Sequence, residues 1–377
     1  MKRQMVAMAM ADRVQHDVET SWLFDLVRRK GEENADACAT LAHALGSFAD
    51  YALSDWHRSA LKTILQNLVE EIAASIRDQV VLVAERLGAA PPAIPDEFFQ
   101  QYDGAVMEML VRNGFYESPA LVEAAAHRLC QEQLERAHRL ERAQGGGISN
   151  TLADILLLQT PSVAANALSR YQAQKALYID GFDNPVLPCT ALDTAAMGDL
   201  VWRVAAALRI VCRSERPVGM AQIDGLIDAA ATAVAGSLNA PDDCAAGQLA
   251  SVLVQEARLG EEALVDLFGT GETPLAEAWI AARANLRPVL VRRLLYEAGG
   301  DRLAVLARFI GFSSDGLSLI YRMTRPGGAG LFFAEGQGEG DPLALFEKID
   351  AKDACRIVQY WSLSSDYSRA LTALTRD

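Results

Sequence analysis

The sequence has no apolar segment that approaches the roughly 18 to 20 residues needed to cross a bilayer. Its six cysteines lie far apart, without the Cys-x-x-Cys spacing of zinc and redox sites. These absences predict a cytoplasmic protein with no membrane span, no disulfide bond and no cysteine-bound zinc. The apolar run within residues 1–12 is too short and too rich in methionine for a signal peptide, so we expect a disordered tail there.

Catalytic signatures are missing as well. The chain contains no GxSxG, no HExxH, no EF-hand loop and no GxGxxG after a strand pattern. His127 and Cys130 share one predicted helix with His138, but His138 lies more than two turns beyond Cys130, too far for one metal ion. Asp55 and His57 are two apart on a helix and do not face each other, which favours a capping role. We therefore assign no catalytic residue, cofactor or metal, and we predict that the protein is not an enzyme.

Acidic residues outnumber basic ones along the chain. The formal net charge of −14 argues against nucleic acid or an anionic membrane as the main partner. A local exception is a set of arginines on consecutive short helices: Arg283, Arg287, Arg292, Arg293, Arg302 and Arg308. A stack of helices can align such residues along a groove that binds a phosphate or an acidic peptide. The interleaved acids Glu277, Glu297 and Asp301 weaken this interpretation.

Helical periodicity is what the sequence does contain. Alanine and leucine dominate, and β-branched runs are scarce. In the longest pattern, over 53–87, apolar residues recur every three or four positions: Leu61, Leu65, Leu68, Ile72, Ile76, Val80, Val83 and Leu87. They form one stripe of a helix that Ser54 or Asp55 caps, while Arg77 falls off the stripe and is expected in solvent. No proline or glycine interrupts the run, so we predict one continuous helix whose stripe other helices cover.

Caps, prolines and glycines divide the remainder into shorter helices. We predict these helices near 14–30, 34–45, 96–113, 118–143, 148–158, 162–177, 190–213, 221–238, 243–258, 261–268, 274–284, 288–298, 301–310, 314–323, 342–349, 351–361 and 364–374. Gly31 is expected to end the first of them. Short connections make successive helices antiparallel neighbours, as in an α-solenoid array. The predicted fold class is therefore all-α.

Three consecutive glycines, Gly145 to Gly147, mark the clearest linker. Because three glycines are costly inside any helix or strand, we place a domain boundary there. The prediction is an N-terminal helical domain over 13–146, followed by a C-terminal helical-repeat domain over 147–377.

A glycine-rich segment over 326–342 carries Phe332 and Phe333. It is either a partner-binding loop anchored by the two phenylalanines or a connection whose phenylalanines pack back onto the core. It lacks the Gly-Lys-Ser/Thr end of a nucleotide-binding P-loop, which excludes that function.

Parts of the chain resemble known helical repeats. Residues 68–88 are similar to the HEAT-repeat signature, in which an apolar–Arg pair, here Ile76–Arg77, opens a second helix. That resemblance implies a bend of the long helix near Ala73 to Ser75. The chain as a whole resembles an alphaproteobacterial family catalogued as domain of unknown function 2336, through Leu53 to Arg58, Ile64 to Val69, Ile76–Arg77, Ala84 to Leu87, Leu187–Pro188 and Leu200 to Arg209. The resemblance implies a HEAT-like repeat fold and brings no catalytic residues.

From these observations we predict a non-enzymatic adaptor or regulatory scaffold that binds another protein through a groove. Its predicted partner-binding residues are Arg287, Arg292, Arg293, Phe332 and Phe333. The alternative is a helical-repeat protein that binds a small molecule or nucleic acid, including a glycosylase-like enzyme. That alternative requires a desolvated carboxylate or histidine in the groove. The sequence specifies neither the partner's identity nor an oligomeric state.

Overall fold

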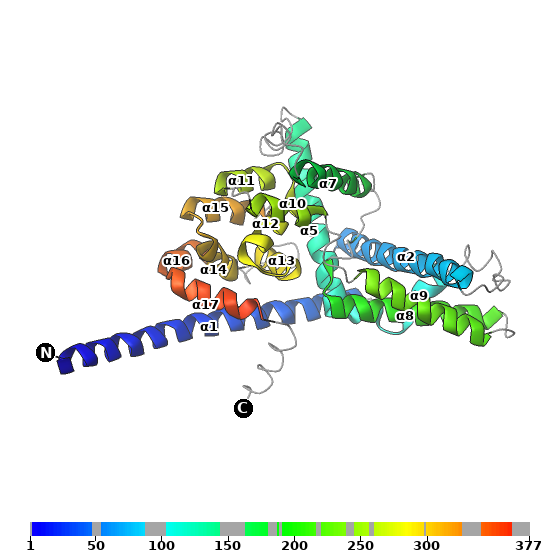
Figure 1. Cartoon of the computed structure of the whole chain (residues 1–377), viewed down its shortest axis with the longest axis horizontal. Coiled ribbons are helices and arrows are strands. Elements are labelled where there is room, and N and C mark those ends of the chain that lie inside the picture. Colours follow the sequence, from blue (N-terminus) through cyan, green and yellow to red (C-terminus); the bar gives the residue numbers. More distant parts are fainter. Residues whose placement is uncertain are drawn as a thin grey trace. The chain divides into compact units, whose positions relative to one another are not determined.

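The computed structural model describes residues 2–46, 54–86, 103–143, 163–179, 187, 191–215, 220–238, 245–255, 260–297, 299–325 and 341–363. Helices joined by turns make up these residues, and no strand occurs within the described ranges (Figure 1). This confirms the predicted all-α class.

The described helices follow one another in the order given below, and the connections from α11 to α15 are only a few residues long. The first are α1 (Lys2–Gly46), α2 (Asp55–Arg86), α4 (Asp103–Arg112), the 3-10 helix η1 (Phe115–Glu117), α5 (Pro119–Ala143), α7 (Val163–Ile179) and α8 (Thr194–Glu215). The next are α9 (Met220–Leu238), α10 (Ala245–Gln255), α11 (Glu261–Gly269), α12 (Thr273–Ala284) and α13 (Pro288–Tyr296). The last are α14 (Asp301–Ile310), α15 (Ser314–Met323), α16 (Pro342–Lys348) and α17 (Ala351–Trp361).

Local start and stop signals place most helix ends where the sequence predicts them. α5 begins at Pro119 and ends at Ala143, as expected from the Ser118–Pro119 pair. At the start of α17, Asp350 Oδ1 accepts a hydrogen bond from the Lys352 N–H at 3.0 Å. The helices from α7 to α17 agree with the predicted segments to within a few residues at either end.

α1 differs from the prediction. Two helices separated at Gly31 and a disordered tail over 1–12 were expected, whereas α1 runs without interruption from Lys2 to Gly46. A single glycine inside a helix costs only about 1 kcal/mol relative to alanine. Gly31 also lies close to α14, because a Cβ at this position would come 3.4 Å from Arg302 Nη1. One isolated glycine is therefore too weak a breaker to divide so long a helix.

α2 is one helix from Asp55 to Arg86, without the break that the HEAT resemblance implies. Ser54 caps it, because the Ser54 Oγ accepts a hydrogen bond from the His57 N–H at 3.3 Å. Arg77, expected in solvent, is only 7% exposed. The reason is that α2 packs against α4, α5, α8 and α9, so it is covered over more than one stripe.

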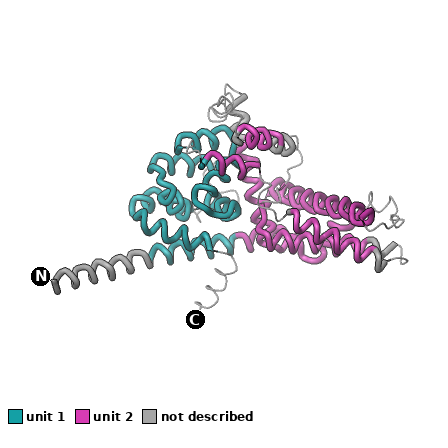
Figure 2. The backbone as a smooth tube through the Cα atoms, viewed as in Figure 1, with its two compact units in different colours: residues 1–37, 254–377 teal, residues 38–253 magenta. Residues whose placement is uncertain are grey.

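The chain divides into two compact units (Figure 2). Unit 1 comprises residues 1–37 and 254–377, and unit 2 comprises residues 38–253. The predicted boundary at Gly146 falls in the segment 144–162, outside the described residues, and stays a prediction.

Unit 2 contains a bundle of long helices. α2 contacts α4, α5, α8 and α9, and α8 also packs against α4 and α9. The seam of α2 is apolar along its length: Leu61, Leu65, Leu68, Ile72 and Ile76 are each at most 1% exposed. Burying one such side chain contributes about 1.5–3 kcal/mol relative to leaving it in water. The predicted stripe is therefore confirmed as core from Leu61 to Val80, whereas Val83 is half-buried and Leu87 lies outside the described residues.

Unit 1 is built around α14. This helix packs against α12, α13, α15, α16 and α17. It is apolar on all sides in its middle, where every residue from Leu303 to Ala307 is at most 1% exposed. Successive helices from α11 to α16 also pack against their chain neighbours. In a linear solenoid each repeat contacts only its neighbours, so the contacts of α14 extend beyond that pattern.

Several predicted features lie outside the described residues. They are the glycine linker at 145–147, the helices near 148–158 and 364–374, and the part of the glycine-rich loop that holds Phe332 and Phe333.

Candidate functional site

The predicted arginine cluster belongs to α12, α13 and α14 of unit 1, and its members have three different environments. Arg283 and Arg287 are exposed at the connection between α12 and α13. Arg292 and Arg293 are half-buried on α13. Arg302 is only 7% exposed in the first turn of α14. The structure therefore separates arginines that face solvent from arginines that stabilise the unit.

The connection between α12 and α13 is a tight corner. Asn285 ends α12 with a left-handed backbone, at a φ of 52°, a conformation that asparagine tolerates. The Leu286 N–H then donates back to the Ala281 carbonyl at 2.9 Å. Arg287 is extended, and Pro288 fills the first turn of α13, where a missing N–H costs nothing. Side chains on this corner are carried by a well-defined backbone.

Arg292 is engaged from inside the unit. Its Nε donates to Glu277 Oε2 at 3.0 Å, and the Tyr296 hydroxyl donates to Glu277 Oε1 at 2.5 Å. Glu277 is 1% exposed, so an unpaired carboxylate there would be costly. The arginine and the tyrosine use both carboxylate oxygens and tie α12 to α13. Arg292, predicted to bind a partner, thus has a structural role in this unit.

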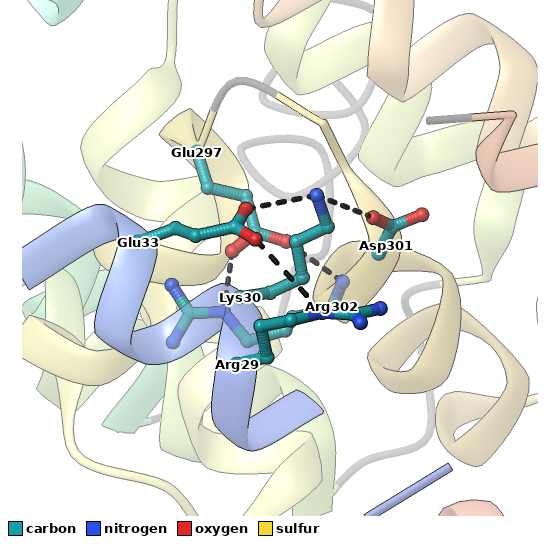
Figure 3. Close-up of polar contacts among 6 residues, drawn as sticks. All are labelled: Arg29, Lys30, Glu33, Glu297, Asp301 and Arg302. Carbon is teal, nitrogen blue, oxygen red and sulfur yellow. Dashed lines mark hydrogen bonds and ion pairs between the residues drawn. The ribbon is translucent and has the colours of Figure 1, made fainter. Parts of the chain in front are cut away.

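A second buried carboxylate, Glu297, follows the end of α13. Its Oε1 accepts the backbone N–H of Arg302 at 2.7 Å, and its Oε2 accepts a hydrogen bond from Arg302 Nε (Figure 3). The carboxylate therefore satisfies a free N–H at the start of α14 and pairs with the guanidinium of the same turn. Arg325, just after α15, donates to the Glu297 backbone carbonyl and lies 4.2 Å from the centre of the Tyr321 ring. This cluster ties α13, α14 and α15 together.

α1 adds a further layer of charge to this cluster. Lys30 Nζ lies 2.9 Å from Glu33 Oε2 and 3.8 Å from Asp301 Oδ2, and Arg29 Nε lies 3.9 Å from Glu33 Oε1 (Figure 3). Burial raises the pKa of Asp301 above its ordinary value, Glu33 raises it further, and Lys30 and Arg29 oppose the rise. Phe24 of α1 packs edge to face against Tyr360 of α17, with 6.2 Å between the ring centroids. These contacts attach this part of α1 to α14 and α17.

Arg308 is structural as well. Its Nε donates to the Ile349 carbonyl at 3.0 Å, and its guanidinium lies over the Phe346 ring at 5.2 Å. No sequence pattern marked Glu277 or Glu297 as partners of arginines, because each pair joins separate helices. The only sequence feature that indicated such ion pairs was the alternation of acidic residues and arginines along these consecutive short helices.

Arg283 and Arg287 are the members of the cluster left for an external ligand. Among the described residues, neither side chain makes a hydrogen bond or an ion pair. The dipole of α12 accounts for a cation in its last turn, where Arg283 lies. Arg287, by contrast, directly precedes α13. It therefore lies at the positive end of the α13 dipole, where a cation is disfavoured. An anionic partner at this corner would remove that penalty.

The other sequence candidates do not converge on a site. Within the described ranges, no three or more His, Cys, Asp and Glu residues are placed to hold a metal ion. His127 and Cys130 lie on α5, and the side chain of His138 is outside the described residues. Cys38, Cys130 and Cys355 are free thiols. None of the described helices combines the length and the apolar character needed to cross a membrane.

A family match accounts for the middle and later part of the chain. Residues 159–341 match the model of a family described as uncharacterised protein conserved in bacteria, DUF2336. The matched segment includes α7 to α15 and confirms the family resemblance that the sequence pattern indicated. No curated protein and no solved structure matches the chain. Over residues 159–341, this chain is therefore similar to the DUF2336 family of bacterial proteins.

Proposed function

We propose that this protein is a non-enzymatic cytoplasmic adaptor that binds an acidic segment of another protein at the α12–α13 corner. The observation that carries the proposal is Arg287, an exposed arginine at a helix start that disfavours positive charge. Arg283 stands on the other side of the same tight turn. Guanidinium groups bind carboxylates through paired, charge-assisted hydrogen bonds, so two exposed arginines fit an acidic segment.

Electrostatics is compatible with binding of an acidic segment at this corner. The net charge of −14 repels acidic partners at long range. At physiological ionic strength the Debye length is only about 8 Å, so a local positive corner acts on a segment that reaches it. The backbone of this corner is already ordered in the free protein. Binding a partner there therefore costs little additional conformational entropy of this chain.

The helical scaffold beneath the corner is part of the same proposal. Successive helices from α11 to α16 pack against their chain neighbours, which is a feature of HEAT-like repeats. The buried pairs of Glu277 and Glu297 hold α12, α13 and α14 in register beneath the two arginines. Such a unit presents a fixed surface and is suited to capturing a partner segment.

The competing function, a helical-repeat protein that binds a small molecule or nucleic acid or acts as a glycosylase-like enzyme, requires a desolvated carboxylate or histidine in the groove. The buried carboxylates of Glu277 and Glu297 each have both oxygens engaged within the unit. The arrangement at these two residues supports a structural use of their charge.

The test is affinity capture of the tagged chain at native expression level, with crosslinking and mass spectrometry. The informative variant is Arg283→Glu/Arg287→Glu. Its matched control is Lys348→Glu/Lys352→Glu, which reverses two exposed lysines of the same unit and changes the net charge equally. We expect a reproducible partner that the control retains and the arginine variant loses, with crosslinks from an acidic stretch of the partner to the α12–α13 corner.

Phe332→Ala/Phe333→Ala tests separately whether the glycine-rich loop contributes to the same partner. Equal recovery of every partner by the arginine variant and the lysine control would overturn the proposed corner. A nucleic acid or metabolite that co-purifies instead of a protein would favour the competing function.

A further inference from the structure

Asn285 stands between the two exposed arginines of the α12–α13 corner. Exposure alternates along this stretch, because Arg283, Asn285 and Arg287 are exposed, whereas Ala284 and Leu286 are only 4% and 7% exposed. The two buried side chains hold the corner against unit 1, and the three polar side chains face solvent. An amide therefore lies between two guanidinium groups on the surface to which the proposed function assigns an acidic segment.

The left-handed backbone at position 285 does not by itself require this amide. At every other left-handed position among the described residues the chain has a glycine: Gly114, Gly271, Gly300 and Gly311. Glycine is the least strained residue in that conformation, and asparagine replaces it less often. An asparagine side chain commonly bonds to the nearby backbone, but that of Asn285 makes no hydrogen bond among the described residues. Its amide is therefore available to an external ligand.

The two helices that meet at this corner are locally basic in an acidic chain. Residues 273–296 contain four arginines, no lysine and a single carboxylate, that of Glu277. Glu277 is 1% exposed and accepts a hydrogen bond from Arg292 inside the unit. Neither helix therefore carries an exposed carboxylate that would compete with an acidic ligand for Arg283 and Arg287.

The amide distinguishes between possible anionic ligands. A guanidinium only donates hydrogen bonds, so the arginines alone would suit any carboxylate or phosphate. An asparagine side chain presents a donor beside an acceptor, and a phosphate or carboxylate has no donor for its oxygen. In an extended peptide, the N–H and the C=O of one residue lie on the same edge of the chain. That edge matches both groups of the Asn285 amide.

We infer that the corner binds an acidic segment in extended conformation, and that Asn285 pairs with the main-chain N–H and C=O of one residue of that segment. Arg283 and Arg287 bind the carboxylates of the residues on either side. These two residues point to the same face of an extended chain and lie about 7 Å apart along it. The inference rests on the proposed function and names the partner segment that the corner recognises.

Two peptide probes test the main-chain contact with the full-length chain. The first is acetyl-Gly-Glu-Gly-Glu-Gly-amide, isotope-labelled so that its chemical shifts report the dissociation constant. In the second, glycolic acid replaces the central glycine, so an ester oxygen takes the place of one N–H while both carboxylates remain. We expect the wild type to bind the ester about tenfold more weakly, because a hydrogen bond is lost and two oxygens face each other.

Asn285→Gly is the informative variant, because glycine adopts the left-handed backbone without strain and removes only the amide. It should bind the first peptide about tenfold more weakly than the wild type and should bind the two probes within about twofold of each other. Arg283→Glu/Arg287→Glu should lose both probes, and the control Lys348→Glu/Lys352→Glu should bind them as the wild type does. Circular dichroism and thermal denaturation check that each variant is folded.

The outcomes separate this inference from the proposed function. If the arginine variant loses the peptide but Asn285→Gly keeps the wild-type affinity and the sensitivity to the ester, the main-chain contact is refuted and the acidic-segment function stands. If inorganic phosphate binds the wild type as tightly as the peptide does, the corner recognises charge alone and the inference is overturned. A wild type that binds neither probe also overturns it, and the capture experiment then decides the proposed function independently.

Discussion

The bundle of unit 2 and the helices α12 to α14 of unit 1 are held together by different physical means. In the bundle, the 32-residue helix α2 presents an apolar seam to its neighbours from Leu61 to Ala84. In unit 1, α13 has only 9 residues, and the buried carboxylates of Glu277 and Glu297 add specific contacts to the apolar packing. Helix length explains the difference. Each helix end leaves backbone groups without a partner, so a train of short helices needs more caps and side-chain partners per residue than one long helix does.

The largest expected effect concerns the buried charge of unit 1. Glu297→Ala leaves the guanidinium of Arg302 buried without its carboxylate, so we expect the free energy of unfolding to fall by about 3–5 kcal/mol. Urea denaturation combined with hydrogen exchange of the α14 amides measures it. As a control, Glu32→Ala removes only an exposed ion pair with Arg28 and should cost at most about 1 kcal/mol. Equal costs for the two variants would show that unit 1 does not depend on its buried pair.

The second prediction concerns the apolar seam of unit 2. Leu68→Ala removes a side chain that is 0% exposed and should cost about 2–5 kcal/mol through lost burial and a cavity. Hydrogen exchange of the α2 amides under increasing denaturant localises the loss. Leu82→Ala, at a 42% exposed position on the same helix, should change stability by less than about 0.5 kcal/mol. Similar losses at both positions would contradict the seam as the source of stability.

A glycine pair compares the two regions at the level of the backbone. At Gly316 in α15, a Cβ would come 1.9 Å from Glu261 Oε1. That carboxylate accepts the Ser313 N–H at 2.8 Å, so Gly316→Ala should displace it and cost about 1–2 kcal/mol. At Gly198 in α8, nothing lies within 4 Å of an added Cβ. Gly198→Ala should therefore stabilise the protein by about 0.4–1 kcal/mol. Thermal denaturation measures both, and shifts of the same sign would contradict this contrast.

The smallest expected effect is a pH dependence in unit 1. Burial raises the pKa of Asp301 above its ordinary 3.8, so the folded protein holds this proton more tightly than the unfolded chain does. The contribution of Asp301 to stability is then largest in acid and falls as the pH rises from 3.8 through the raised value. Asp301→Asn should flatten this decline, although it also loses the contact with Lys30. Chemical denaturation at several pH values measures the slope, and an unchanged slope would refute the assignment.

The helix boundaries were largely predictable because local rules determine them. Ser118–Pro119 predicted the start of α5, and the uninterrupted stripe predicted α2 as one helix. Gly31 misled the prediction, because the cost of one glycine is smaller than the free energy that the surrounding helix gains. Arg77 misled it as well, because periodicity identifies one buried stripe and does not reveal how many neighbours a helix has.

The candidate site was predictable only as a group of residues. The sequence alone determined that arginines concentrate between positions 283 and 308, that the chain is helical and that residues 159–341 carry a recognisable family pattern. Tertiary structure decided which arginines are buried in ion pairs and which remain exposed. Arg292 and Arg302 meet carboxylates on other helices or across a turn, whereas Arg283 and Arg287 stay in solvent. The physical reason is that helix formation depends on neighbours in sequence, while the partner of a charge depends on which helices pack together in space.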